Sequence, residues 1–352
     1  MRFGMDTRVK PAYDDVPRQC ATIIIESGRT RREDPVTRIA KDAVWPELPL
    51  AAWQDSYATL RLWTQIIGKV RFELKPFLNH SWSVTLYVTV RGLGTGPIPL
   101  DGRDLSIDFD FLDHVLWLRT SDGHVRQIML RPVSVAEFYG EVMEALAALG
   151  VTVRIDQMPN EIENAVPFSQ DRANASYDRD FATRHFRILA ANARVFAHFR
   201  TGFLGKASPV HFFWGSFDLA VTRFSGRPAP LLTTSATPGL SLAVAREAYS
   251  HEVSSAGFWP GGGPIDYPAY YSYAYPEPEG FAAAKVRPAA AFYFNDFGQF
   301  ILPYDAVRQA ADPQAALMEF LQSTYDSAAD LGKWDRAALD CALGEKGKVR
   351  VV

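Results

Sequence analysis

Hydrophobic residues recur along the chain at helical spacing in four places. A three-to-four spacing after Trp53 predicts an amphipathic helix that Gly68 ends. Ser134, with Glu137 three residues later, forms a capping box before the second helical stretch. Asp312 is typical of the residue that caps a helix at its start. The helices are expected over residues 53–67, 134–149, 177–203 and 313–331.

Segments rich in β-branched and aromatic residues separate these helices and predict strands. Ser121-Asp122-Gly123 is typical of a hairpin turn between two of them. The tyrosine-rich stretch from Tyr267 to Tyr275 is flanked by prolines and is interpreted as an edge strand. The expected strands cover residues 81–91, 104–111, 114–119, 125–130, 151–155, 210–224, 249–258, 270–275 and 289–294.

This order of elements predicts an α+β fold with two similarly built halves, each an antiparallel sheet covered by helices. Residues 45–156 form the first half and 177–344 the second, and a polar connector over 156–176 joins them. Residues 1–44 show no period that would bury a face, so they are interpreted as disordered or as an extension upstream of the true start. Residues 345–352 are a tail.

A faint internal repeat leaves an ancient duplication open. A Gly-Lys pair, a proline, a histidine, a tryptophan and a strand follow a helix in each half. A genuine duplication would place His80 and His211 at equivalent positions. The spacings differ by several residues, however, so two independently built halves are the alternative.

Composition excludes several classes of protein. Lys and Arg number 37 against 40 Asp and Glu, a formal net charge of −3, so no basic surplus exists to hold nucleic acid. No run approaches the roughly 20 apolar residues of a membrane-spanning helix. The two cysteines, Cys20 and Cys341, cannot build a disulfide framework, which favours the cytoplasm.

No standard catalytic or nucleotide-binding motif is complete in this sequence. The Gly92-Leu93-Gly94-Thr95-Gly96 turn runs into Pro97 and not into a helix, so it lacks the N-terminus that binds a dinucleotide. Gly261-Gly262-Gly263 has no following Lys-Ser or Lys-Thr. His251-Glu252 resembles the start of a zincin helix, but Ser255 stands where the second histidine belongs. No nucleotide cofactor is expected.

The first candidate cluster surrounds Asp218. A carboxylate among apolar neighbours needs a partner, because burying it unpaired costs several kcal/mol. Asp218 therefore either pairs with Arg223, Arg227 or Lys206, or serves as a functional carboxylate. His211 lies an odd number of residues away and would need a bulge at Gly215 to reach the same face.

The second candidate cluster is His251-Glu252, beside the glycine-rich turn after Trp259. An adjacent imidazole and carboxylate are a plausible acid–base pair. Convergence of His211, His251 and Glu252 would also supply the two-histidine, one-carboxylate set that holds a divalent metal, so such a metal is a candidate cofactor. The alternative is that both histidines are hydrogen-bonded core residues.

These clusters lead to two functional hypotheses. The first is a small-molecule enzyme with His211, Asp218, His251 and Glu252 as catalytic residues. The second is a non-catalytic ligand-binding or scaffold protein whose aromatic residues line a pocket or a subunit interface. The expected substrate-binding residues lie where the second sheet meets the first half and comprise Trp82, Lys206, Trp214, Arg223, Arg227 and Trp259.

Long blocks of unusual composition also resemble a known family. They are Trp63-Thr64-Gln65-Ile66-Ile67-Gly68-Lys69-Val70-Arg71, Asp108-Phe109-Asp110-Phe111, residues 206–227 and residues 249–261. From Trp45 to about Leu343 the sequence resembles the bacterial family catalogued as domain of unknown function 5996. The resemblance implies one continuous, soluble bacterial module and assigns no catalytic residue.

Overall fold

The computed structural model describes residues 40–234 and 240–350. These described residues form one compact unit. Most of the N-terminal segment expected to be disordered, residues 1–39, lies outside the described residues. A short helix begins at Lys41, within the last residues of the segment over 1–44.

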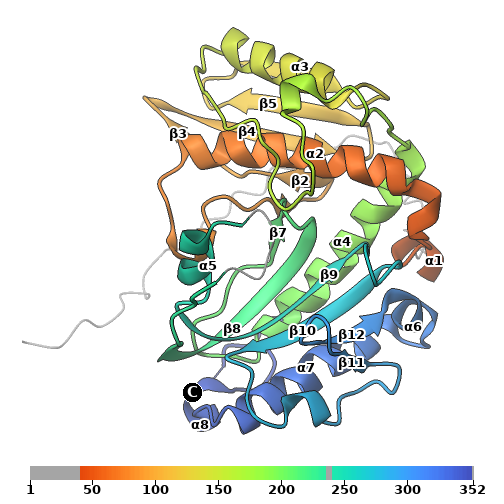
Figure 1. The fold of residues 1–352 in the computed structure, drawn as a ribbon, viewed down its shortest axis with the longest axis vertical. Helices are drawn as coiled ribbons and strands as arrows, with labels where there is room; N and C mark the ends of the chain where they lie inside the picture. Colours follow the sequence, from red (N-terminus) through yellow and green to blue (C-terminus); the bar gives the residue numbers. More distant parts are fainter. Residues whose placement is uncertain (1–39, 235–239, 351–352) are drawn as a thin grey trace, which may run out of the picture. The chain divides into compact units, whose positions relative to one another are not determined.

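The α+β prediction is confirmed, with helices and two antiparallel sheets of six strands each (Figure 1). The helices of the described chain are α1 Lys41–Val44, α2 Leu50–Leu74, α3 Val135–Ala148, α4 Arg179–Arg200, α5 Leu242–Ala248, α6 Tyr304–Gln309, α7 Pro313–Leu331 and α8 Arg336–Leu339. Three short 3-10 turns add η1 Asn79–Ser81, η2 Phe168–Gln170 and η3 Phe281–Ala283.

Each half contributes one sheet. The first has the order β1-β2-β4-β5-β6, with β3 also paired to β4, and the second has the order β11-β12-β10-β9-β8-β7. The strands of the first sheet are β1 Tyr87–Val88, β2 Gly92–Gly94, β3 Ile98–Leu100, β4 Arg103–Asp110, β5 Val115–Thr120 and β6 Val125–Met129. Those of the second are β7 His211–Phe213, β8 Asp218–Pro228, β9 His251–Trp259, β10 Ala269–Tyr275, β11 Phe292–Phe294 and β12 Gln299–Pro303.

Helix α2 passes between the two sheets, which explains why its middle is buried on every side from Leu62 to Arg71 (Figure 1). The prediction that Gly68 ends this helix is wrong. Gly68 lies inside it, and a Cβ there would fall 2.1 Å from the indole nitrogen of Trp214. The glycine therefore serves close packing rather than helix termination.

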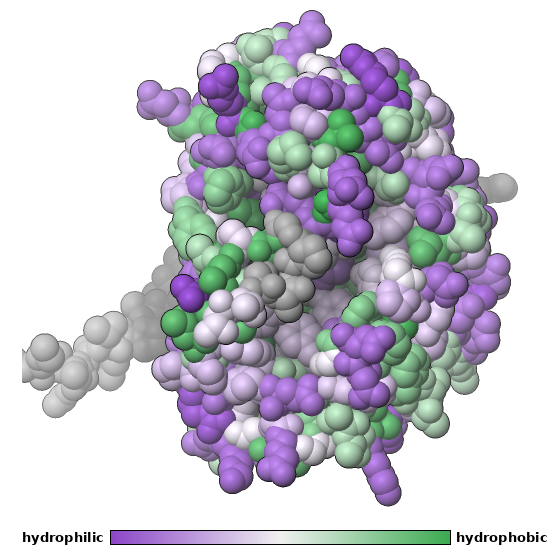
Figure 2. Space-filling model, viewed as in Figure 1, coloured by the Kyte–Doolittle hydropathy of each residue, from purple (hydrophilic) through white to green (hydrophobic). Residues whose placement is uncertain are grey.

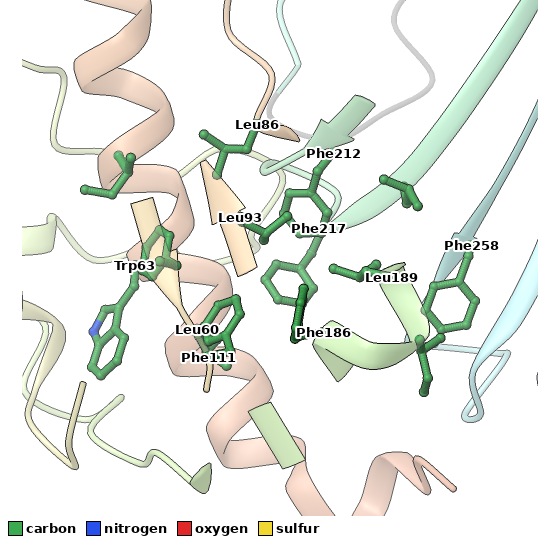
Figure 3. Packing of buried hydrophobic residues seen from close by; sticks show 14 of the residues in the cluster. Leu60, Trp63, Leu86, Leu93, Phe111, Phe186, Leu189, Phe212, Phe217 and Phe258 are labelled. Carbon is green, nitrogen blue, oxygen red and sulfur yellow. The ribbon is translucent and has the colours of Figure 1, made fainter. Parts of the chain in front are cut away.

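One hydrophobic core joins the halves. Leu60 and Trp63 of α2 and Leu93 of β2 belong to the same buried cluster as Phe186 of α4 and Phe212 of β7. Figure 3 shows these side chains gathered in the space between α2, β2, β7 and α4. The continuous core fixes the position of the second sheet against α2, and that position forms the site described below.

The two faces of the second sheet have different surroundings. Helices α4 and α7 pack on one face, through contacts with β8, β9 and β10. The other face turns towards α2. Strand β10 lies between β12 and β9, so the interpretation of the tyrosine-rich stretch as an edge strand is wrong. Its tyrosines at positions 271, 273 and 275 all point to the face that turns towards α2, because strand side chains alternate.

Other predicted elements also differ from the structure. Residues 81–91 form only the two-residue strand β1, and residues 151–155 form no strand. The expected strand over 210–224 is a hairpin, with a turn at residues 214–217 between β7 and β8. Strand β12 was not expected. The predicted helices over 134–149, 177–203 and 313–331 match α3, α4 and α7 to within three residues at each end.

The repeat does not place its two histidines at equivalent positions. His80 lies in the turn η1 with a positive φ of 58°, whereas His211 begins strand β7. Among the helices of residues 40–234 and 240–350, none is both long and apolar enough to cross a membrane.

Candidate functional site

A cleft of about 950 Å³ lies between α2, the connector over residues 156–163 and the free face of the second sheet. Figure 2 shows the surface hollowed between the level of α2 and that of the second sheet. Aromatic rings supply much of its wall, with carboxyl and hydroxyl groups between them. The aromatic lining residues are Tyr57, Phe72, Phe77, Trp82, Phe213, Trp214, Phe224, Tyr249, Trp259, Tyr271, Tyr273 and Phe297.

Asp218 lies on the floor of the cleft and is 6% exposed. The hydroxyl of Ser216 donates to one carboxylate oxygen and the phenol of Tyr271 to the other. None of the three cations considered as its partner, Lys206, Arg223 and Arg227, bonds to it. Hydroxyl donors therefore replace the expected ion pair.

The turn from β7 to β8 holds this carboxylate in place. Phe217 adopts a left-handed φ of 62°, which is rare for a bulky side chain. Its ring is 1% exposed and stacks on His185 of α4, with ring centres 5.0 Å apart. Burial of this ring anchors the turn, so the neighbouring Ser216 and Asp218 are directed into the cleft.

Glu161 of the connector supplies a second carboxyl group to the cleft. A Cβ added to Gly215 would lie 2.3 Å from its Oε1 atom, so the Glu161 carboxyl group rests directly against the β7–β8 turn. Arg61 fixes this arrangement, because its guanidinium donates to the backbone oxygens of both Glu161 and Gly215 at 2.8 Å.

Three polar residues at four-residue spacing on α2 hold the connector. Besides Arg61, the Gln65 amide exchanges hydrogen bonds with the backbone of Asn160 at 2.9 and 2.8 Å. Lys69 donates to the backbone oxygen of Met158 at 2.6 Å and to Asp156 at 3.2 Å. Residues spaced by four share one helix face, so this stripe fastens the connector along the cleft.

Both carboxyl groups resist ionisation. Burial, with a further contribution from the nearby Asp218 charge, raises the pKa of Glu161 to about 7. Burial likewise raises the pKa of Asp218, although the bonds from Ser216 and Tyr271 oppose the rise. Two like-charged groups in a partly desolvated site favour a shared proton. Glu161 is therefore poised to gain or lose a proton near neutral pH.

The structure brings some predicted binding residues to this cleft. Trp82, Trp214 and Trp259 line it. The indole of Trp214 donates to the backbone oxygen of Val84 at 2.8 Å, which fixes one wall. The ammonium of Lys206 lies 5.3 Å from the ring centre of Trp82, behind the wall and outside the lining.

Lys206 instead contacts His80. Its Nζ donates to the His80 Nε2 at 2.5 Å, so the His80 Nδ1 carries the proton and donates to Ala248 at 3.2 Å. Burial, and secondly the charge of Lys206, lowers the pKa of His80. Sequence reasoning used His80 only in the repeat, yet it lines the end of the cleft.

His211 lies on the same face of the sheet as Asp218, because a hairpin joins their strands. The bulge expected at Gly215 is therefore not needed. The ring is 1% exposed between Trp82 and Tyr87, and neither ring nitrogen has a hydrogen-bond partner among the described residues. Burial, with the charges of Arg71 and Arg200, lowers its pKa to about 3.

The expected convergence of His211, His251 and Glu252 does not occur. On β8, Ala220 faces His211 and Pro228 faces His251, so the two histidines lie at different ends of that strand. His251 and Glu252 are consecutive residues of β9, so their side chains point to opposite faces of the sheet. Within residues 40–234 and 240–350, no three His, Cys, Asp or Glu side chains gather closely enough to hold a metal ion.

Glu252 and the two arginines occupy positions outside the cleft. Arg227 pairs with Glu252 at 2.6 Å and also donates to the backbone at Gly332 and Lys333 after α7. Arg223 points to the helix-covered face, where its guanidinium lies 3.5 Å from the ring centre of Phe199. Arg223, Arg227 and Glu252 therefore contribute to the packing of α4 and α7 on the second sheet.

Residues 45–341 match a single family, which is described as a family of unknown function. The chain belongs to the DUF5996 family. The match covers both sheets, α2 and the connector, so the whole cleft is built from residues of the DUF5996 module. No curated protein and no solved structure matches the chain.

Sequence reasoning missed Glu161, because it lies in the connector interpreted as a domain boundary. The signal that could have found the connector was the stripe of Arg61, Gln65 and Lys69, three long polar side chains at four-residue spacing among the apolar residues of one helix. Buried polar side chains need partners, and these three find them on the backbone of residues 156–161 and 215.

Proposed function

We propose that this DUF5996 protein is an enzyme that acts on a small molecule in the cleft, with Glu161 and Asp218 transferring protons. The observation that carries the proposal is the pair of carboxyl groups in the cleft, Asp218 buried and Glu161 half-buried, neither of which forms an ion pair with a side chain of the described chain. Enzymes use such pairs as general acid and base, since their proton affinities are displaced towards neutral pH.

The two groups have different proposed roles. The pKa of Glu161 is near neutral, and its carboxyl oxygens accept no hydrogen bond from the described residues, so it is the group that exchanges a proton with substrate. Asp218 is held by Ser216 and Tyr271 and stabilises positive charge or the protonated form of Glu161. Trp82, Trp214 and Trp259 form the wall on which an apolar part of the substrate packs.

The remaining predicted site residues have supporting roles in this proposal. Lys206 braces His80 at the end of the cleft. His211 fills space behind the wall as a neutral ring. Arg227 and Glu252 join the sheet to α7, and Arg223 fills the interface with α4. No divalent metal is required for the proton transfers proposed here.

The proposal can be tested without a known substrate. Purified protein is incubated with a bacterial small-molecule extract, and compounds that disappear or form are followed by mass spectrometry. Wild type is expected to convert at least one compound. Glu161→Gln is expected to slow that conversion by about 10²–10⁴-fold, the usual contribution of a general acid or base.

Glu144→Gln is the matched control, because Glu144 is an exposed residue of α3. It should leave the rate within about twofold of wild type. Melting temperatures of all variants are compared, so that loss of folding is separated from loss of chemistry. An extract that wild type leaves unchanged, or a Glu161→Gln variant as active as wild type, would overturn the proposal.

A ligand-binding protein without chemistry is the second candidate. The observation that favours it is that both Asp218 oxygens already accept hydrogen bonds from Ser216 and Tyr271, as in a rigid recognition site. In that case the extract would yield bound compounds that are recovered unaltered.

We also infer a cytoplasmic location from the scarcity of cysteine, which fluorescence microscopy of a tagged chain tests directly.

A further inference from the structure

The cleft has an excess of acidic side chains. Five carboxyl-bearing residues line it, Glu73, Asp156, Glu161, Glu163 and Asp218, whereas the cationic lining residues within the described chain are Arg61 and Lys69. Both cations have their donors engaged, Arg61 on backbone oxygens and Lys69 on Met158 and Asp156. Lys69 pairs with Asp156, whereas Glu161 and Asp218 form no ion pair within the described residues, so a charge on either of these two carboxyl groups has no counter-ion in contact with it.

Four tyrosines surround this negative centre. Tyr271 bonds to Asp218, and the Tyr249 and Tyr273 hydroxyls lie 3.0 Å apart on the same face. Burial is the main cause of the raised pKa of Tyr57, Tyr271 and Tyr273, and the charge of Asp218 adds to each. The four phenols thus stay neutral, and they line the cleft with aromatic rings, which attract a cation that lies over a ring face.

We propose that the substrate of this cleft is a small molecule with a protonated amine, whose ammonium group lies between Glu161 and Asp218 and whose apolar part packs on Trp214 and Trp259. The inference rests on the function proposed above and names its substrate class. A cation would pair with the two carboxyl groups, and the surrounding aromatic side chains favour the same charge where it lies over a ring face. An anionic ligand would be repelled by the ionised carboxyl groups, and the donors of Arg61 and Lys69 are already engaged.

Three probes of one shape test the charge that the cleft selects. They are 2-phenylethylamine, 2-phenylethanol and phenylacetate, which are cationic, neutral and anionic at pH 8. Dissociation constants are measured by ligand-observed NMR on the full-length protein. The amine is expected to bind at least about tenfold more tightly than the alcohol, and the anion should show no measurable binding.

Substitutions of the two carboxyl residues test where the amine binds. Glu161→Gln and Asp218→Asn should each reduce the preference for the amine over the alcohol by about tenfold, whereas Glu144→Gln should retain it. Equal or tighter binding of the alcohol or the anion would overturn the inference. If Glu161→Gln also abolishes conversion in the extract while no amine preference exists, the enzyme proposal survives and the amine proposal alone fails.

The affinity should also depend on pH in a defined direction. Groups that face Glu161 are Arg61 of α2, Asp218 of β8 and Tyr249 before β9. A bound ammonium favours the ionised carboxyl groups, so amine affinity should rise by about tenfold between pH 6 and pH 8. The probe amine stays protonated over this range, since simple amines titrate near pH 10. Affinity that falls or stays constant would contradict the assignment.

Discussion

Tyr271 of β10 donates a hydrogen bond to Asp218 of β8 across the whole width of the intervening strand β9. Adjacent strands lie about 4.8 Å apart, so a phenol has to lie flat over β9 to span the distance. Gly257, the residue of β9 opposite Tyr271, permits this, because a Cβ there would fall 2.4 Å from the phenol oxygen. A glycine thus connects two strands of the proposed site.

Tyr271→Phe removes one donor from a buried carboxylate. We expect a loss of about 1–3 kcal/mol in the free energy of unfolding at pH 8, because a buried acceptor is left with one donor fewer. The loss should be smaller at pH 4, because the bond lowers the pKa of Asp218 and its removal matters less once the carboxyl is protonated. Urea unfolding at both pH values measures the difference.

Tyr293→Phe is the control for that variant. Tyr293 donates at 2.5 Å to Glu277, whose side chain is exposed to water. Removal of the Tyr293 hydroxyl should lower the free energy of unfolding by less than about 1 kcal/mol at either pH, since water replaces the lost hydrogen bond. Equal costs for the two variants would show that Tyr271 and Asp218 interact no more strongly than a surface pair.

Two glycines in helices should respond to alanine with opposite signs. Gly140 of α3 has open space around its Cα, so Gly140→Ala should stabilise the protein by about 0.5–1 kcal/mol. Gly68 of α2 lies against the Trp214 indole, and Gly68→Ala should cost about 1–3 kcal/mol by forcing that ring away. Urea unfolding checks both, and stabilisation by Gly68→Ala would contradict the packing.

Arg61→Met should release the connector that carries Glu161. It removes two charge-assisted hydrogen bonds to backbone oxygens, each worth about 1.5–3 kcal/mol. Hydrogen exchange followed by mass spectrometry should show faster exchange in residues 156–163, with little change in α3. Arg154→Met, at an exposed position, is the control. Unchanged exchange in the connector would mean that Arg61 does not hold it.

Stability should fall on the acid side of neutrality because of two buried histidines. Burial lowers the pKa of His185 and of His211 to about 3. Below pH 6.5 the unfolded state binds protons at these histidines and the folded state does not. The free energy of unfolding is therefore highest above pH 6.5 and decreases below it. Each histidine accounts for roughly 2 kcal/mol between pH 7 and pH 5.

His211→Phe tests this sign directly. Both nitrogens of His211 are buried without a partner in the described chain, so a phenyl ring loses no hydrogen bond there. The variant should be at least as stable as wild type at pH 7 and more stable at pH 5. Urea unfolding at the two pH values gives the comparison. An unchanged dependence on pH would contradict a buried, neutral His211.

The sequence predicts this fold well where one physical signal dominates. Helix α3 follows its capping box, since the Ser134 hydroxyl accepts from the backbone nitrogen of Glu137. Helix α2 overruns Gly68 because tertiary packing against Trp214 outweighs local helix propensity. The strand expected over 81–91 reduces to β1 because His80 and Ser81 both adopt positive φ values of 58° and 55°.

The site was harder to predict, because it depends on contacts between distant segments. Asp218 was identified as a carboxylate in apolar surroundings, and burial does raise its pKa. Its hydrogen-bond partners, however, are Ser216 two residues away and Tyr271 two strands away. The pairing with Tyr271 cannot be predicted from the sequence around Asp218. Glu161 lies 57 residues before Asp218 in a polar connector, where composition alone indicates a linker.

The most direct test of this account is the titration of Glu161, followed by NMR of the labelled carboxyl carbon in wild type and in Asp218→Asn. Burial and the nearby Asp218 charge predict a pKa of about 7 in wild type. Without the Asp218 charge it should fall, yet stay above the ordinary value of about 4.3. A Glu161 that titrates near its ordinary value in both proteins would contradict the proposed carboxyl pair.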